Sequence, residues 1–403
     1  MQSFFLGRQP ILDVDGKTIA YELLFRSSNT NAYDPSVDGD SATSQVLINA
    51  VTELGIDKIT GDKLAFVNLT NRFLEQPELL EFLPADRVVL EVLETTSVND
   101  KVISGVEALK RAGHKIALDD FIMSKEFEPL LALADIIKYD ITQYKPEELC
   151  EIARLRTSGH PKLLAERVET ADEFKMYRDA GFEYFQGYFF AKPEVISGSK
   201  IPSDKITLLQ LLAQVNDDNV TLDDVADILS REVSLGVRAL KYVNSPLSGV
   251  RTEVTSIKQA AVMLGRDTIR NWVMLMIVAN MNDKPPELFS MALIRGRFCQ
   301  ICAKREHLED DGAYFTMGLL SLLDAMMDLK MDQVLDNISA TRELRDTLQL
   351  NQGRASELLN VVRFLEANSN APDTADIEVS DAMNNAYFEA IGWAEQTSQL
   401  MAA

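Results

Sequence analysis

The chain has 403 residues, enough for two ordinary domains, and its hydrophobic content of 46% excludes an intrinsically disordered protein. Lys and Arg number 40 against 62 Asp and Glu, which gives a net charge of −22. Such a charge repels nucleic-acid backbones and anionic membrane surfaces, so nucleic-acid binding and peripheral membrane attachment are disfavoured.

The first half of the chain alternates between strand-like and helix-like patterns. Strand-like runs at residues 4–14 and 18–26 are joined by Asp15-Gly16, a strong signal for a tight antiparallel hairpin. Further strands are expected at residues 64–70, 88–93, 115–121, 136–141, 163–168 and 184–190. Helices are expected between them, among others at residues 43–54, 100–112 and 146–156.

Eight strands alternating with helices in about 195 residues predict a largely parallel sheet that closes into a barrel. We therefore expect an α/β fold, a modified TIM barrel with an antiparallel first strand. A doubly wound open sheet is the alternative, but no glycine-rich phosphate loop follows the first strand.

Polar residues recur where these strands should end. Asp119 and Asp120 directly follow the buried run that ends in Leu118, and adjacent carboxylates repel each other unless a cation lies near them. Alone, such a pair is more often a helix N-cap. Other predicted strand ends, however, also carry acids or amides, and one carries a lysine: the full set is Glu22, Asn68, Glu91, Asp119, Asp120, Lys138, Glu166 and Gln186. They would converge on one mouth of a barrel, where hard oxygen ligands suit Mg²⁺ or Mn²⁺ and a two-metal site for phosphoester hydrolysis.

Short motifs in this half carry a resemblance to a known family. In chain order they are Gln9-Pro10-Ile11, Glu22-Leu23-Leu24-Phe25-Arg26, Val67-Asn68-Leu69, Leu90-Glu91-Val92-Leu93-Glu94, Leu118-Asp119-Asp120-Phe121, Ile137-Lys138-Tyr139-Asp140, Ala165-Glu166-Arg167-Val168-Glu169 and Phe185-Gln186-Gly187-Tyr188. Together they resemble the EAL domain family over residues 1 to about 195. That family comprises cyclic di-GMP phosphodiesterases and their non-hydrolysing relatives.

The resemblance implies a role for each matched residue. One metal ion would be held by Glu22, Asn68, Glu91 and Asp119, and the other by Asp119, Asp120 and Glu166. The catalytic residues would be Lys138, Glu166, Glu22 and Asp119, with Lys138 orienting the attacking water or the phosphate. The residues that position the dinucleotide would be Gln9, Arg26, Glu169 and Gln186. A plain ion-pair role for Lys138 remains the alternative.

Two positions depart from the family pattern. Residues 121–127 contain no glycine, although the family has Gly-Thr-Gly in this loop, which shapes the second metal site and a dimer contact. Glu94, which works with that loop, is retained. Arg167 stands where the family has a glycine beside Glu166, and its side chain either enters the mouth or points outward. A homodimer is therefore left open.

The pattern changes after residue 195. Residues 196–204 are expected to form a linker between a barrel domain at 1–195 and an all-helical domain at 205–403. Thr221 to Asp224 has the form of a capping box that opens a helix to about residue 233. Further helices are expected at residues 235–243, 257–264, 267–279, 286–306, 314–329 and 354–366.

The helical half resembles the HDOD family. The motifs are Tyr242-Val243-Asn244-Ser245, Ser256-Ile257-Lys258-Gln259-Ala260, Leu264-Gly265 and Ile269-Arg270-Asn271-Trp272. HDOD domains look like HD phosphohydrolases that have lost their metal ligands, and Ser321-Leu322 stands here where His-Asp would follow. With three histidines in the whole chain, no multi-histidine metal centre can form in this half. A regulatory or protein-binding role is expected.

The cysteines and apolar stretches bear on the cellular compartment. Three cysteines are too few for a disulfide framework, and we expect Cys299 and Cys302 to be buried structural thiols. The N-terminus lacks a signal-peptide pattern, and the most apolar later stretch, residues 272–281, has about half the length of a membrane span. A cytoplasmic protein is expected.

Three functions are compatible with these patterns. The first is a metal-dependent phosphodiesterase that hydrolyses cyclic di-GMP to linear pGpG under control of the helical domain. The second is a non-catalytic cyclic di-GMP receptor with a degenerate site. The altered loop after Asp120 favours this function. The third is an interaction scaffold that binds no nucleotide.

Overall fold

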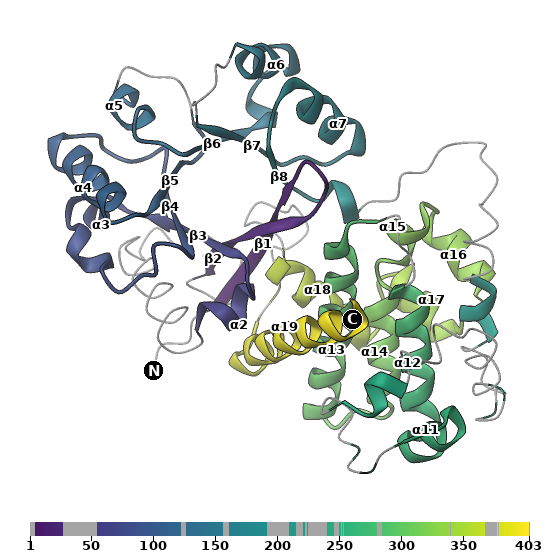
Figure 1. Ribbon diagram of the computed structural model, residues 1–403. Coiled ribbons are helices and arrows are strands. Elements are labelled where there is room, and N and C mark those ends of the chain that lie inside the picture. Colours follow the sequence, from purple (N-terminus) through teal and green to yellow (C-terminus); the bar gives the residue numbers. More distant parts are fainter. Residues whose placement is uncertain are drawn as a thin grey trace. The chain divides into compact units, whose positions relative to one another are not determined.

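The structure, a computed structural model, describes residues 5–26, 55–121, 126–155, 161–191, 209–214, 221, 224, 240–245, 250, 252, 254–279, 284–338, 340–366, 377 and 379–402 (Figure 1). By its contacts the chain divides into two compact units. One comprises Met1–Phe190 with Arg363–Asn384, and the other comprises Ala191–Val362 with Asn385–Ala403. The expected linker at residues 196–204 lies outside the described residues and stays a prediction.

The chain begins with the hairpin that its sequence predicts. Strands β1 (Phe5–Asp13) and β2 (Thr18–Arg26) pair antiparallel. Gly16 in the turn has a φ of 75°, a conformation that glycine adopts without strain. The Asp13 carboxylate accepts hydrogen bonds at 2.9 Å from the backbone N–H groups of Asp15 and Lys17, which closes the turn.

Eight strands form a closed barrel in the order of the sequence. The six strands after the hairpin are β3 (Leu64–Leu69), β4 (Val88–Val92), β5 (Lys115–Leu118), β6 (Ile136–Asp140), β7 (Lys162–Glu166) and β8 (Tyr184–Gln186). Neighbours from β2 to β8 pair in parallel, whereas β1 runs antiparallel to both β2 and β8. The prediction of a barrel with an antiparallel first strand is thus confirmed.

Two strands, β5 and β8, end well before the residues at which their sequences predict an end. Strand β5 stops at Leu118 because Asp120 has a φ of 41°, which leaves the extended conformation. Strand β8 stops at Gln186 because Gly187 has a φ of 147°, and a short 3₁₀ helix, η4 (Phe189–Ala191), follows. Both turns lie at the end of the barrel where the polar residues collect.

The barrel interior is filled by one layer of apolar side chains, at most 4% exposed: Ile11, Ala20, Phe66, Val89, Ala117, Ile136 and Leu164. Figure 1 shows the helices of this unit around the outside of the strands. These helices are α2 (Ile56–Thr60), α3 (Asn71–Glu75), η2 (Pro77–Leu80), α4 (Asp100–Arg111), α5 (Glu128–Leu131), η3 (Ile141–Gln143), α6 (Pro146–Arg154) and α7 (Ala171–Ala180). The expected helix at residues 43–54 lies outside the described residues.

The described part of the second half is helical. Its named elements are α11 (Ile257–Leu264), α12 (Arg266–Ala279), α13 (Pro286–Arg305), α14 (Asp311–Leu320), α15 (Leu323–Met327), α16 (Met331–Asn337), α17 (Arg342–Leu348), α18 (Arg354–Glu366) and α19 (Asp381–Ala402). Among the described residues, no helix has both the length and the hydropathy that a membrane span requires.

The helix predictions that fall on described residues of this half are mostly confirmed, whereas most of the expected helix that ends at about residue 233 and most of the one at residues 235–243 lie outside the described residues. Helices α11 and α18 have the expected bounds, and the reciprocal bonds of the capping box join Thr221 and Asp224. The single helix expected at residues 314–329 is wrong, because the chain breaks at Ser321 and Leu322 between α14 and α15. Both residues are buried, so the apolar pattern continues across the break and conceals it.

Candidate active site

The carboxyl ends of the parallel strands form the candidate site. The hydrogen-bonding register places Asn68 of β3 beside Glu91 of β4, and Gln9 of β1 beside Glu22 of β2. Because alternate side chains of every strand face the interior of a closed barrel, the inward-facing side chains at one rim converge on a common centre. The sequence prediction that these polar residues lie at one end of the barrel therefore agrees with the observed register.

Lys138 lies at the centre of four carboxylates. Its ammonium Nζ is 2.6 Å from Asp119 Oδ1, 2.7 Å from Glu91 Oε1, 3.0 Å from Glu166 Oε1 and 3.3 Å from Glu22 Oε2. The Lys138 side chain is 1% exposed. Each carboxylate comes from a different strand or strand end, so the cluster exists only because the barrel closes.

Two amide side chains orient the carboxylate of Glu22. Gln186 Nε2 donates a hydrogen bond to Glu22 Oε2 at 2.7 Å and another to Gln9 Oε1 at 2.9 Å. Asn68 Nδ2 donates to Glu22 Oε1 at 3.2 Å. Both oxygens of Glu22 are thereby engaged from β3 and β8, the elements on either side of the hairpin.

The cluster shifts the proton affinities of its members. Burial raises the pKa values of Glu91, Asp119 and Glu166, and the attraction of Lys138 does not cancel this effect. Burial also opposes ionisation of Glu22, but Lys138 together with the hydrogen bonds from Gln186 and Asn68 lowers its pKa. For Lys138, burial is outweighed by the surrounding acids, and its pKa is raised well above the usual value.

The charges and oxygen atoms of the cluster match the needs of a divalent cation. With every group ionised, four carboxylates face one ammonium, which leaves three uncompensated negative charges in a buried place. Buried oxygens without a hydrogen-bond partner among the described residues include Asn68 Oδ1, Glu91 Oε2 and Glu166 Oε2. Hard oxygen donors of this kind fit Mg²⁺ or Mn²⁺.

The spatial arrangement, however, is that of a lysine-centred cluster. Among the described residues, no three His, Cys, Asp or Glu side chains are grouped around a point that could hold a metal ion. The ammonium of Lys138 takes the position that brings the carboxylates together. The donor set therefore fits a metal ion, and binding requires the ammonium to move aside.

A small cavity of about 70 Å³ opens above the cluster. Its lining residues are Gln9, Glu22, Asp119, Asp120, Glu166, Arg167 and Gln186. Asp120 and Arg167 both have left-handed backbone conformations, with φ of 41° and 57°. Burial raises the pKa of Asp120, with further increases from Asp140 and Glu94. Residues with unusual backbone conformations are common at functional sites, and two of them line this cavity.

Arg167 lies at this mouth and not away from it. Its Nη1 lies 3.3 Å from Oδ2 of Asp140. The left-handed φ also explains why a glycine would suit this position. The loop after Asp120, at residues 122–125, lies outside the described residues.

Two of the residues expected to position the dinucleotide are not placed in the cavity. Glu169 is exposed, and its backbone N–H donates to the Glu173 carboxylate at the start of α7. The side chain of Arg26 lies outside the described part of the structure. Gln9 and Gln186 do line the cavity. The roles assigned to all four stay predictions.

Sequence reasoning assigned no role to Asp140, which holds Arg167 of the cavity lining by an ion pair. Asp140 ends β6 and is 2% exposed. It accepts hydrogen bonds from the backbone N–H of Thr142 at 2.9 Å and from Gln143 Nε2 at 3.1 Å, besides its ion pair with Arg167. Its position in the sequence could have indicated a role. Asp140 stands at a strand end two residues after Lys138, so both side chains point to the same face of the strand.

Comparison with known proteins identifies both halves. Residues 2–193 match the EAL domain, and residues 201–352 match the HDOD domain. The chain is 32% identical over 370 residues to the Vibrio cholerae protein named cyclic di-GMP phosphodiesterase CdgJ, covering 91% of this chain and 85% of that one. It is 30% identical over 402 residues to the uncharacterized protein YuxH of Bacillus subtilis, covering 96% and 97%.

A solved structure gives a weaker likeness. The Xanthomonas citri FimX EAL domain in complex with c-diGMP is 19% identical, with a TM-score of 0.39, and the match covers 46% of this chain and 85% of that one. The long matches to the two full-length relatives decide the assignment. The chain belongs to the family of proteins in which an EAL domain is followed by an HDOD domain.

Proposed function

We propose that the barrel half hydrolyses one phosphodiester bond of cyclic di-GMP to give linear pGpG, with a divalent metal ion as cofactor. The observation that carries this proposal is the buried Lys138 among four strand-end carboxylates, at the rim where barrel enzymes have their active sites. The substrate is inferred from the 32% identical relative that is named a cyclic di-GMP phosphodiesterase.

The chain supplies oxygen ligands and one cation, the Lys138 ammonium, to this reaction. The residues that would hold Mg²⁺ or Mn²⁺ are Glu22, Asn68, Glu91, Asp119, Asp120 and Glu166. Bound there, such an ion would stabilise the charge that develops on the phosphoryl group and would lower the pKa of a water molecule. Lys138, displaced from the centre of the acids, holds the attacking water or a phosphate oxygen by a charge-assisted hydrogen bond.

The amides at the rim are assigned to the dinucleotide. Gln186 and Gln9 line the cavity, and their hydrogen-bonding capacity suits phosphate oxygens or guanine edges. In the ligand-free structure they bond to each other and to Glu22, so the ligand must replace contacts that already exist. Arg26 and Glu169 are retained as further candidates.

The test is hydrolysis by the purified full-length chain. With Mg²⁺ or Mn²⁺ we expect chromatography to detect pGpG, and we expect Glu22→Ala and Lys138→Ala to abolish turnover. Matched controls lie at the opposite rim, where Glu183 accepts a hydrogen bond from the Leu163 N–H and Lys162 donates to the Tyr184 hydroxyl. Glu183→Gln and Lys162→Met should therefore retain activity.

A cyclic di-GMP receptor is the second candidate, favoured by the glycine-free loop after Asp120. Tight binding of the nucleotide in calorimetry without any product over hours would establish the receptor. Absence of binding with or without metal would leave only an interaction scaffold. The helical half is proposed to regulate the barrel or bind a protein partner, and a homodimer remains a prediction.

We also infer a cytoplasmic location. Cys150, Cys299 and Cys302 are all buried free thiols, which supports a reducing compartment. The proposed ligand is consistent with this location. Fluorescence imaging of the tagged full-length protein in intact and fractionated cells tests it, and a membrane or secreted fraction would contradict it.

A further inference from the structure

The helical half contains a cavity that is larger than the one at the barrel mouth. Among the described residues, it has a volume of about 390 Å³ and is lined by Tyr242, Thr268, Asn271, Leu275, Arg297, Gln300, Asp310, Asp311, Gly312, Phe315 and Trp393. These residues come from the segment at 240–245, from α12, α13, α14 and α19, and from Asp310, the N-cap of α14. Small-molecule sites range from about 300 to 1,000 Å³, so this volume suits one small ligand.

The cavity wall is held in place by a buried amide. Asn271 of α12 donates a hydrogen bond from Nδ2 to the Gly312 carbonyl at 3.2 Å and accepts one at Oδ1 from the Thr316 hydroxyl at 2.9 Å. Asn271 and Thr316 are 7% and 5% exposed. The bonds connect α12 to α14, so the wall on that side is formed before any ligand enters.

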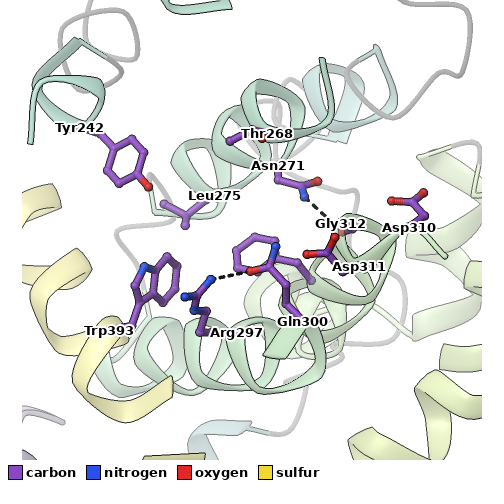
Figure 2. Close-up of a pocket in the computed structure, with 11 residues that line it drawn as sticks. Tyr242, Thr268, Asn271, Leu275, Arg297, Gln300, Asp310, Asp311, Gly312 and Trp393 are labelled. Atoms are coloured by element: carbon purple, nitrogen blue, oxygen red, sulfur yellow. Dashed lines mark hydrogen bonds between the residues drawn. The ribbon is translucent and has the colours of Figure 1, made fainter. Parts of the chain in front are cut away.

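One side of the cavity is aromatic. Figure 2 shows Trp393 and Tyr242 on the same side of the cavity, with Arg297 beside Trp393. The Phe315 ring packs edge-on against Trp393, with centroids 5.9 Å apart. The Arg297 guanidinium carbon lies 5.4 Å from the Trp393 ring centroid. Indole and guanidinium are both planar surfaces on which a heteroaromatic ring can stack.

Arg297 keeps hydrogen-bond donors that no described residue uses. Its Nη1 donates to Gln300 Oε1 at 2.8 Å, as Figure 2 shows, and its Nη2 lies 3.9 Å from a Glu389 oxygen, beyond hydrogen-bonding distance. Its Nε is buried and has no hydrogen-bond partner among the described residues. An unused buried donor costs free energy, and a ligand oxygen would satisfy it.

Positive charge continues from Arg297 along α13. A second cavity of about 300 Å³ shares Arg297, Gln300 and Asp311 with the first and is also lined by Lys304, Arg305 and Glu389. Arg305 Nη2 bonds to Glu389 Oε2 at 3.2 Å, whereas Lys304 forms no ion pair with any described residue. Lys304 is thus without an ion pair among the described residues, and Arg297 has only a long one, at 3.9 Å, to Glu389.

An acceptor group faces the cations. Asp311, in the first turn of α14, lines both cavities, and no described residue bonds to its carboxylate. Figure 2 shows it on the side of the cavity opposite Trp393. A carboxylate in such a position can accept the two hydroxyl groups of a ribose, the contact that dinucleotide-binding folds also use.

We propose that this cavity is a binding site for a purine nucleoside monophosphate. The base stacks against Trp393, the ribose hydroxyls donate to Asp311, and the phosphate accepts from Arg297 and Lys304. The three chemical parts of such a ligand match the three groups of side chains around two cavities that share Arg297, Gln300 and Asp311. The site is independent of the barrel and of its proposed reaction.

Tryptophan fluorescence tests the site directly. The chain has two tryptophans, so Trp272→Phe leaves Trp393 as the only tryptophan, which is excited selectively at wavelengths where tyrosine does not absorb. With the full-length variant we expect GMP or AMP to change the Trp393 emission saturably. Guanosine and ribose 5-phosphate should bind at least about tenfold more weakly than the nucleotides. Calorimetry on the wild-type chain, which needs no substitution, provides the second measurement.

Variants of matched charge make the test specific. Arg297→Gln should weaken GMP binding about tenfold or more, because it removes the bidentate phosphate contact. Arg342→Gln is the control, since it removes the same charge from a side chain that is 94% exposed on α17, and it should leave binding unchanged. Glu22→Gln in the barrel should leave the Trp393 response unchanged.

Three outcomes would overturn the proposal. The first is the absence of saturable binding of either nucleotide at millimolar concentration by both methods. The second is equal affinity of folded Arg297→Gln and wild type, with folding checked by thermal melting. The third is loss of the Trp393 response in Glu22→Gln, which would place the nucleotide in the barrel.

Discussion

The ammonium of Lys138 and the carboxylate of Glu91 lie 2.7 Å apart, with side chains that are 1% and 0% exposed. Neither group can be hydrated in this position, so each depends on the other for compensation of its charge. Burial raises the pKa of Glu91 in spite of the ion pair, and the charges of nearby acids raise it further. The stability of the barrel and the chemistry of its mouth therefore depend on the same contact.

Removal of the central cation should destabilise the barrel in a pH-dependent manner. Lys138→Met leaves buried carboxylates without a counter-ion, and in metal-free buffer we expect a loss of about 3–5 kcal/mol in the free energy of unfolding. The folded-state pKa values of Glu91, Asp119 and Glu166 are raised, so stability falls as the pH rises through them.

Loss of Lys138 raises those three pKa values further, so the loss of stability should be smaller at about pH 5 than at about pH 8. Urea unfolding of both chains at the two pH values measures the difference. Lys162→Met, at the opposite rim, is the control and should show a small loss that does not depend on pH. Equal destabilisation of Lys138→Met at both pH values would contradict the charge argument.

Divalent metal ions should stabilise the chain. Mg²⁺ or Mn²⁺ at about one hundred times its dissociation constant is expected to add about 2.7 kcal/mol to the free energy of unfolding. Asp119→Asn should abolish the increase in melting temperature, because it removes a carboxylate of the cluster. Glu183→Gln should retain it. An increase of the same size in Asp119→Asn would show that the ions bind elsewhere.

The backbone conformation of Arg167 predicts a difference between two substitutions. Arg167→Ala loses the ion pair with Asp140 and keeps the unfavourable φ of 57°, whereas Arg167→Gly loses the same ion pair and relieves the strain. The ion pair itself contributes little, because the arginine side chain is 42% exposed. Chemical denaturation should find Arg167→Gly more stable than Arg167→Ala by about 1 kcal/mol. The opposite order would show that the φ carries no strain.

Gly187 should not tolerate a side chain. It has a φ of 147°, and an added Cβ would overlap the backbone N and O atoms of Val168. Gly187→Ala is expected to destabilise the barrel by about 2–4 kcal/mol and to lower activity, because the Val168 N–H donates to the carbonyl of Gln186 at 3.0 Å. Gly392→Ala in α19 is the control, since an added Cβ there meets no atom within 4 Å. In thermal melting, Gly187→Ala should have a clearly lower melting temperature than Gly392→Ala.

Several local features could be predicted because neighbouring residues decide them. The hairpin depends on Asp15 and Gly16, and the capping box on Thr221 and Asp224, so their patterns are visible in four or five consecutive residues. Cys299 and Cys302 are buried as expected. Both family resemblances, which rest on short motifs in a consistent order, are confirmed.

Other features could not be predicted because they depend on contacts between distant residues. The sequence does not show the break at Ser321, because the residues before and after it are also buried and the helical pattern of apolar residues is not interrupted. The ion pair between Arg167 and Asp140 depends on a left-handed φ that arginine does not favour. In the helical half, Tyr242 and Trp393 line one cavity although about 150 residues separate them, and no local pattern connects them.

The amino-acid sequence alone determined the strands, their polar ends and the membership of both halves in known families. Period-two alternation sets which face of a strand a side chain occupies, and that is a local property. Only the tertiary structure decided that the Lys138 ammonium meets four carboxylates, because closure of the barrel brings together residues from β2, β4, β5, β6 and β7. Their mutual distances, and therefore their pKa values, result from that closure.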